Sequence, residues 1–244
     1  MDIDDDNDFI ERQGVDQMSD IALGYGSKWH LLRYLGYHRD RLNEEVQGGT
    51  GVIVERWLDF PYDKSRKLLD GEWKGLDFLP EHEPARNAWN DFWPQTGNVP
   101  NWDAVGVAQN DKQTEWLLVE AKAHIGELHS ECKAKDPASK EQIRKALAEA
   151  KGAFGVCPSA NWLSPYYQYC NRLAVLHFLA KHDIAARLLF IYFTGDSNPS
   201  ADCPRDKAGW QAALQELYSE IGLTNESPLK RQVHSILLSI ESDL

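Results

Sequence analysis

The sequence predicts an α/β protein with a mixed β-sheet flanked by helices. Residues 187–194 read RLLFIYFT, a nearly continuous apolar run that is typical of a strand buried on both faces. Two shorter apolar segments, 102–108 and 115–123, flank polar residues around Asn110 and predict a β-hairpin. Segments with helical spacing precede and follow these strands, so the sheet is expected to carry helices on both faces.

The first predicted elements are a helix over 27–46 and a strand over 52–60. Leu31, Leu35 and Leu42 follow helical spacing on one face, and a glycine-rich run ends the helix. The strand follows directly and passes into a proline. The order of helix and strand begins the α/β pattern.

The stretch 70–100 is rich in Trp, Pro, Gly, Asn and acidic residues, and it predicts irregular structure with a short helix over 83–92. Its tryptophans, Trp73, Trp89 and Trp93, have two interpretations. They anchor a loop to the core, which we favour, or they contact a substrate.

The second half of the chain predicts three helices and two strands. A right-handed crossover from the second hairpin strand to the buried strand is expected to make these two strands parallel. Ser139 and Ser164 are the predicted N-caps of the first two helices, and Pro165 is the predicted first residue of the second. The predicted elements are helices over 139–151, 164–182 and 207–221 and strands over 187–194 and 234–241.

Charge divides the chain into two parts. The first 20 of the 244 residues carry eight acids and one base, and so account for −7 of the net charge of −12. This composition predicts a disordered acidic tail over 1–22, followed by a single domain over 23–244. An acidic domain does not hold DNA by a broad basic surface, so any nucleic-acid site is expected to be local.

The chain shows no signal peptide and no apolar run long enough to cross a membrane. Its four cysteines lack CxxC spacing and are interpreted as free thiols. We therefore expect a cytoplasmic protein with no membrane partner.

A Glu-x-Lys pattern closes the second hairpin strand at Glu120-Ala121-Lys122. The pattern occurs four times in the chain, but only here does it end an apolar strand. Alternate residues share one face of a strand, so Glu120 and Lys122 project together with Leu118. Burying an acid and a base without partners is expensive, so their position calls for an explanation.

Asp103 is the predicted partner, because folding the hairpin brings it close to Glu120 or Lys122. Two converging carboxylates can hold Mg²⁺, and Mn²⁺ is a further candidate. Lys122 would then position the attacking water or stabilise charge on a phosphate. The alternative is a Glu–Lys pair and a surface aspartate that only stabilise the hairpin.

This constellation resembles the PD-(D/E)xK, or restriction-endonuclease-like, nuclease superfamily. The pattern there is Pro-Asp, a spacer and Asp/Glu-x-Lys. In this chain two residues separate Pro100 from Asp103, a departure that the family tolerates. The motif covers about a tenth of the chain, while the α-β-β-β-α-β element order extends the resemblance over most of 27–194. The resemblance implies a magnesium-dependent nuclease acting on DNA, with RNA as the second choice.

The resemblance also implies two further catalytic residues. Family members often add a glutamate from the first helix, and Glu45 is the candidate on the predicted inner face. Some use a glutamine in the helix after the Asp/Glu-x-Lys strand, where Gln168 stands. The tyrosine expected four residues later is replaced by Arg172, which leaves the role of Gln168 in doubt. Arg172 has two interpretations, a phosphate contact or an ordinary ion pair.

Two other functions stay open. The chain could be a catalytically inactive protein of the same fold that binds nucleic acid or a protein partner, which its acidic balance favours. It could also bind a small molecule in a tryptophan-rich pocket. The intact set of Asp103, Glu120 and Lys122 favours the nuclease.

Overall fold

The computed structural model describes residues 24–59, 72–81, 83–97, 99–110, 113–223 and 227–240. The predicted acidic tail over 1–22 and the turn residues 111 and 112 of the predicted hairpin lie outside this part of the chain. Among the described residues, no helix combines the length and the apolar character needed to cross a bilayer.

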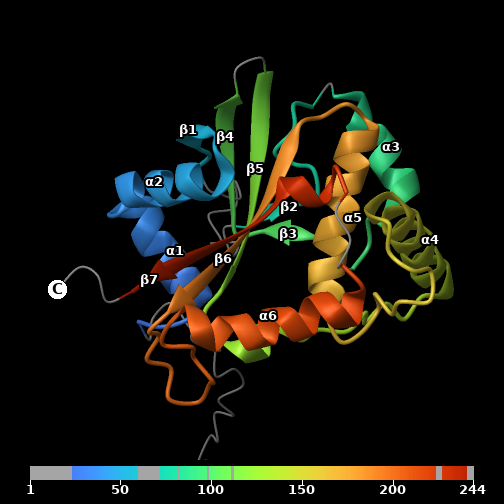
Figure 1. Ribbon diagram of the computed structural model, residues 1–244. Coiled ribbons are helices and arrows are strands. Elements are labelled where there is room, and N and C mark those ends of the chain that lie inside the picture. Colours follow the sequence, from blue (N-terminus) through green and yellow to red (C-terminus); the bar gives the residue numbers. More distant parts are fainter. Residues whose placement is uncertain are drawn as a thin grey trace, which may run out of the picture.

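A five-stranded mixed sheet forms the centre of the structure, in the order β1-β4-β5-β6-β7 (Figure 1). β1, β4 and β5 are antiparallel neighbours, whereas β5, β6 and β7 run parallel. This confirms the predicted mixed α/β sheet. The strands are β1 (Ile53–Trp57), β4 (Ala104–Asn110), β5 (Gln113–Lys122), β6 (Ala186–Thr194) and β7 (Val233–Ser239).

The predicted buried strand is β6, which lies between β5 and β7. Eight of its nine residues are buried, and it is parallel to β5 in the register Glu120↔Phe190. Its apolar side chains pack against helices on both faces of the sheet, as the continuous apolar run predicts.

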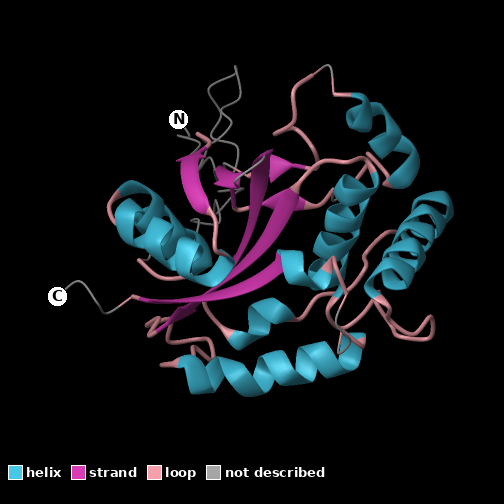
Figure 2. Cartoon of the chain, turned by 45° about the horizontal axis from the view of Figure 1, so that its top comes forward, coloured by secondary structure: helices cyan, strands magenta, loops and turns pink. Residues whose placement is uncertain are grey.

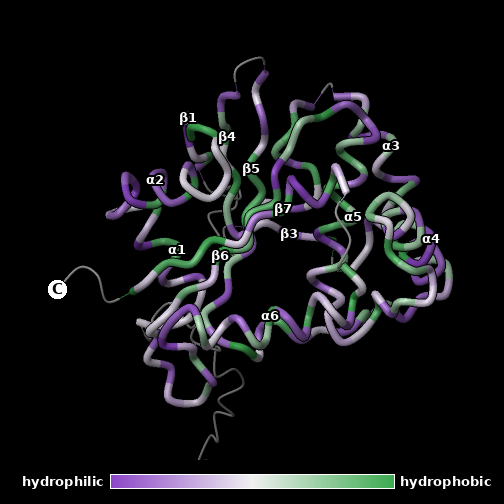
Figure 3. The backbone as a smooth tube through the Cα atoms, viewed as in Figure 1, coloured by the Kyte–Doolittle hydropathy of each residue, from purple (hydrophilic) through white to green (hydrophobic). Residues whose placement is uncertain are grey.

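Helices cover both faces of the sheet (Figures 1 and 2). On one face, α1 and α2 pack on alternate residues of β5, such as Leu117 and Val119, in one hydrophobic cluster. On the other, α3, α4, α5 and α6 bury the residues between, such as Leu118, in a second cluster. The hydrophobic colour in Figure 3 is strongest along the central strands. The helices are α1 (Ser27–Gly36), α2 (Arg39–Thr50), α3 (Pro84–Phe92), α4 (Pro137–Phe154), α5 (Tyr167–Lys181) and α6 (Lys207–Ile221).

The single helix predicted over 27–46 is wrong, because the structure has two helices there. α1 ends at Gly36, and α2 begins at Arg39. Glycine is a poor helix former, and the chain changes direction at Tyr37 and His38, whose N–H groups both bond to the carbonyl of Arg33. The break means that one helical face cannot be extended from α1 into α2.

Four short elements complete the fold. β2 (Trp73–Lys74) pairs with β3 (Asn101–Trp102) in a separate two-stranded sheet, and β2 lies in the stretch 70–100 that the sequence predicts to be irregular. The 3₁₀ helix η2 (Ile125–Leu128) follows β5, and η3 (Lys230–Gln232) precedes β7. β3 lies just before Asp103 and therefore fixes how the chain enters β4.

Two predicted N-caps are wrong. α4 begins at Pro137 and is capped by Asp136, whose carboxylate accepts hydrogen bonds from the backbone N–H and the hydroxyl of Ser139. α5 begins at Tyr167 rather than at Pro165. Its first turn is held by Ser130, whose hydroxyl accepts a hydrogen bond from the backbone N–H of Gln168 at 2.7 Å.

Candidate metal and phosphate site

Asp103 and Glu120 face one another at the open end of the β4–β5 hairpin. The paired residues end at Ala104↔Val119, and Asp103 lies one residue beyond them, bonded to Ala121 and close enough to Glu120 for their charges to interact. The next pair, Val105 and Leu118, lies in the cluster beneath α5, so the acidic pair is on this face too. This arrangement is the one that the sequence predicts.

Two hydrogen bonds fix Asp103 to β5. Its backbone N–H donates to the carbonyl of Val119 at 3.0 Å, and its Oδ2 accepts from the N–H of Ala121 at 2.7 Å. The side chain thereby takes the place of a main-chain acceptor beyond the end of β4. Asp103 is half-buried and borders a cleft.

Glu120 is buried and bonds to two cations. Its Oε1 accepts a hydrogen bond from Lys122 Nζ at 2.5 Å. Its Oε2 accepts from Arg172 Nε at 2.9 Å and lies 2.7 Å from Arg172 Nη2. All three side chains are buried, with 2 % of Glu120, 8 % of Lys122 and 4 % of Arg172 exposed. Because these three charged groups are buried, removing one of them would leave the others without compensation.

Helix α5 brings Gln168 and Arg172 onto the sheet. Gln168 Oε1 accepts a hydrogen bond from Lys122 Nζ at 2.8 Å, so the structure joins Gln168 to the predicted set. Arg172 lies one turn further along the helix and donates to Asn171 through Nη1. Its guanidinium also lies over the ring of Trp102, 5.1 Å from the centroid. Arg172 therefore forms the ion pair of one interpretation, and its contact with a phosphate stays a prediction.

A cleft of about 750 Å³ opens beside these groups. One side is formed by the segment before Asp103, and the other by the 129–139 segment and the start of α5. No tryptophan borders it, since Trp89 and Trp93 are packed in the core. This cleft is therefore not the tryptophan-rich pocket of the small-molecule alternative. The polar residues that line the cleft are Glu72, Thr96, Asn101, Asp103, His129, Ser130, Glu131, Lys133, Lys135, Asp136, Ser139, Tyr167, Gln168, Asn171 and Arg172.

The predicted Glu45 is not part of this site. It is exposed on α2, which covers the opposite face of the sheet, and it does not border the cleft. The prediction assumed one straight helix over 27–46, and the break after Gly36 invalidates that assumption.

Glu72 is a site residue that the sequence did not reveal. It borders the cleft, accepts a hydrogen bond from Asn101 Nδ2 at 3.0 Å and acts electrostatically on Asp103. Its Glu-Trp-Lys pattern lies in the stretch 70–100, for which the sequence predicts irregular structure. The pairing of β2 with β3 holds this segment beside the cleft, and strands of two residues leave no periodic pattern in the sequence from which to predict it.

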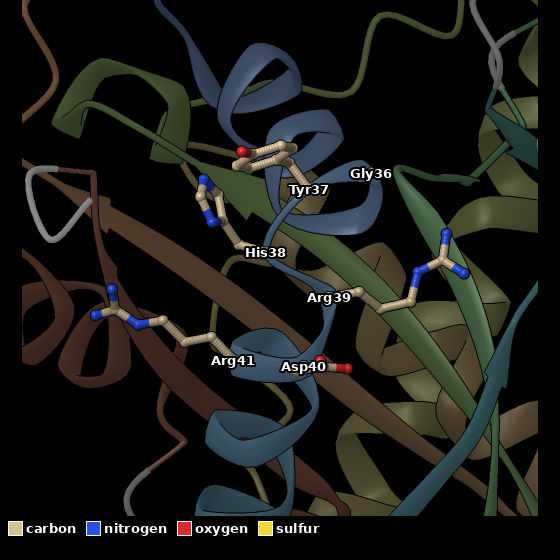
Figure 4. A pocket seen from close by; sticks show the side chains of 6 residues that line it. All are labelled: Gly36, Tyr37, His38, Arg39, Asp40 and Arg41. Atoms are coloured by element: carbon tan, nitrogen blue, oxygen red, sulfur yellow. The ribbon is translucent and has the colours of Figure 1, made fainter. Parts of the chain in front are cut away.

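A second hollow lies at the α1–α2 junction and is lined by residues 36–41 (Figure 4). Arg39 and Arg41 extend in opposite directions there, and Tyr37 is 86 % exposed. Its side chains do not converge on one point, which makes it a poorer candidate for chemistry than the cleft beside Asp103.

The pKa values of Asp103 and Glu120 are shifted in opposite directions. Burial and the neighbouring Glu120 raise the pKa of Asp103 to about 7. Burial also disfavours ionisation of Glu120, but Arg172 and Lys122 outweigh it and lower the pKa of Glu120. Burial likewise opposes the charge of Lys122, yet Glu120, Asp103 and Glu127 raise its pKa. Asp103 is therefore the carboxylate with the least cationic compensation.

The two carboxylates of Asp103 and Glu120 could hold Mg²⁺ or Mn²⁺ only together with water or substrate ligands. The described residues contain no group of three or more His, Cys, Asp or Glu side chains that could hold an ion. Mg²⁺, however, keeps several waters and is often bound by one or two carboxylates together with a substrate phosphate. Asp103 would hold such an ion, and Glu120 would have to share an oxygen with it.

In metal-free protein, we expect Asp103→Asn to be more stable than the parent at pH 8. A raised pKa means that the folded state binds the proton more tightly than the unfolded chain, so its contribution to stability is lost as pH rises from about 4 to about 7. The rise corresponds to at most about 4 kcal/mol, which the partial exposure of Asp103 reduces. Asparagine keeps an acceptor for Ala121 and has no charge.

Urea unfolding in EDTA at pH 5, 6, 7 and 8 checks this expectation. The stability difference between Asp103→Asn and the parent should grow in favour of the variant as pH rises. A constant difference across this range would show that Asp103 ionises in the folded protein as in the unfolded chain.

Comparison with known proteins gives no relative: no family model, no curated protein and no solved structure matches the chain.

Proposed function

We propose that this chain is a metal-dependent nuclease of the PD-(D/E)xK type, hydrolysing phosphodiester bonds in DNA. The observation that carries the proposal is that Asp103 bonds to Ala121, between Glu120 and Lys122, while Lys122 bonds to both Glu120 and Gln168. The element order supports it, because a helical start, an antiparallel β1-β4-β5 meander, helices and a parallel strand follow the α-β-β-β-α-β pattern.

Each residue has a distinct part in this proposal. Asp103 and Glu120 would hold Mg²⁺ or Mn²⁺, and the ion would supply Lewis-acid activation of the phosphate and of the attacking water. Lys122 holds the attacking water or stabilises the phosphate as negative charge develops. Gln168 orients the ammonium of Lys122 through the 2.8 Å hydrogen bond.

The proposed reaction conserves atoms and charge. The water oxygen bonds to phosphorus, and the bond from phosphorus to one sugar oxygen breaks. The nucleophile gives a proton to solvent, and the departing oxygen takes one up. The products are a phosphomonoester end and an alcohol end.

A nuclease assay on purified protein tests the proposal. Single- and double-stranded DNA and RNA are incubated with Mg²⁺, Mn²⁺ or EDTA. We expect cleavage of DNA with a divalent ion and none with EDTA. Folded protein that cleaves none of these substrates with either ion would contradict the proposal.

The chain supplies its own matched control for a contaminating nuclease. Glu149-Ala150-Lys151 repeats the tripeptide of the site on the helix α4, where Glu149 bonds to Lys181 and His177. Glu149→Gln should cleave like the parent, whereas Asp103→Asn should lose activity with its metal. Equal activity in both variants would assign the cleavage to another protein.

A non-catalytic protein of the same fold is the second candidate, and one observation favours it. Both oxygens of Glu120 already accept hydrogen bonds from cationic side chains, so the site can be electrically satisfied without a metal. Nucleic-acid binding that does not change when divalent ions are removed, without any cleavage, would favour this candidate.

A further inference from the structure

Arg172 lies beside the oxygen of Glu120 where a second cation would sit. Lys122 contacts Oε1 of Glu120, while Nε and Nη2 of Arg172 contact Oε2. The guanidinium is further fixed by Asn171 and by the Trp102 ring. A planar cation held by three neighbours keeps its place, unlike a surface arginine with many rotamers.

The ligands present suffice for one metal ion. Two-metal phosphodiesterases place their ions about 3.5–4 Å apart and need several shared carboxylates. The described part of the chain offers no cluster of three potential ligands, and Arg172 already contacts Oε2 of Glu120. One ion at Asp103 and Glu120 is compatible with this set, and a second ion would have to displace the guanidinium.

The burial of the charged groups also favours a single metal ion. Glu120, Lys122 and Arg172 are almost fully buried, and with ionised Asp103 they make a group of two negative and two positive charges. One divalent cation adds two positive charges, which a phosphodiester and the nearby Glu72 and Glu127 offset in part. Charge without compensation is costly in a buried place, so each added ion is less favourable than the last.

Arg172 also has the means to contact a substrate. It borders the cleft, and its contacts with the described residues use three of its five N–H donors. Arginine binds phosphate oxygens through paired donors, which suits a phosphodiester lying in the cleft.

We propose that Arg172 takes the place of a second metal ion, so that the site binds one divalent cation and Arg172 contacts the phosphate. This inference rests on the proposed nuclease function. In this chain Arg172, which stands where the nuclease superfamily pattern has a tyrosine, would then act in catalysis.

Metal stoichiometry tests this inference independently of cleavage. Mn²⁺ is titrated into the metal-free protein by calorimetry, and the loaded protein is examined by electron paramagnetic resonance. We expect one Mn²⁺ per chain and the spectrum of an isolated ion. Two ions per chain, or the spectrum of a coupled pair, would overturn the inference while leaving the nuclease proposal intact.

Three variants separate the charge of Arg172 from its structural role. Arg172→Met should lower cleavage by about 10²–10³-fold and should allow a second Mn²⁺ to bind beside the vacated Oε2 of Glu120. Arg172→Lys should keep one Mn²⁺ and part of the activity. Arg187→Met is the matched control, because Arg187 pairs with Glu115 on the same strand β5.

Arg187→Met should change stability without changing stoichiometry or rate. If Arg172→Met folds, binds one Mn²⁺ and cleaves like the parent, Arg172 has only a structural role and the inference is wrong. If the parent neither binds Mn²⁺ nor cleaves, the proposed nuclease function is wrong. If the parent cleaves but binds two ions, only the role of Arg172 is wrong.

Discussion

Lys122→Met is expected to lower the rate of cleavage by about 10²–10³-fold, the usual cost of one transition-state contact. Metal binding should be largely unchanged, because the carboxylates of Asp103 and Glu120 bind the ion in the ground state. The ammonium matters most when negative charge develops on the phosphate or the water. Its position beside Glu120 and Gln168 is fixed by hydrogen bonds of 2.5 and 2.8 Å.

The fold should tolerate this replacement. Methionine retains most of the buried stem of Lys122, and Glu120 keeps its pairing with Arg172. A loss of activity can therefore be separated from unfolding by circular dichroism and by a melting curve on the same sample.

The measurement combines single-turnover cleavage with calorimetric titration of Mn²⁺ for parent and variant. Lys151→Met is the control, since Lys151 closes the same tripeptide on α4 and bonds to the carbonyls of Pro158 and Ala160. If Lys122→Met cleaves as fast as the parent, the catalytic assignment is wrong and any activity arises elsewhere.

The parts of the fold that the sequence predicts well are those governed by local pattern. The apolar run over 187–194 predicts a central parallel strand, and β6 is that strand. Alternation along 115–123 predicts the shared face of Glu120 and Lys122, on which Lys122 now contacts Glu120. Period and hydrophobicity decide such features, because burial against neighbours enforces them.

The missed features depend on contacts between distant residues. The hydroxyl that holds the first turn of α5 comes from Ser130, not from the adjacent Ser164. Glu72 reaches the cleft through a two-residue strand pairing. Glu45 was misplaced because Gly36 breaks the helix. None of these follows from periodicity, since each is decided by how segments pack in three dimensions.

The ion pair between Arg172 and Glu120 is another feature that sequence pattern alone does not predict. The sequence places Arg172 on a predicted helix and leaves two interpretations, a phosphate contact or an ion pair. Only the packing of α5 on the sheet selects Glu120 as its partner at 2.7 Å. The sequence thus identifies a charged residue as a candidate, but tertiary structure determines which residue it pairs with.

Glu120→Gln is expected to lower the free energy of unfolding by about 3–5 kcal/mol, the usual cost of removing one member of a buried ion pair. The amide leaves Lys122 and Arg172 as two buried cations with no negative partner between them. Urea unfolding of metal-free protein at pH 7 measures this loss. Glu115→Gln is the control, because Glu115 forms its ion pair with one side chain, Arg187, and its other oxygen bonds to the neutral Asn110, so its replacement should cost less.

The pH dependence has a defined sign. The cations lower the pKa of Glu120 below its ordinary value of 4.5, although burial acts against them. The contribution of Glu120 to stability is therefore present above pH 4.5 and is lost as pH falls through the folded pKa. The difference between parent and Glu120→Gln should accordingly shrink in acid, as Glu120 of the parent becomes protonated.

A double variant separates the network from a general loss of packing. In Glu120→Gln combined with Arg172→Met, one of the two orphaned cations is gone, so the double variant should be more stable than Glu120→Gln alone. Glu120→Gln that is as stable as the parent, or a double variant whose losses simply add, would show that the three charges are not coupled. Recovery in the double variant would mean that the electrostatics of the site, more than the shape of Glu120, set its contribution to the fold.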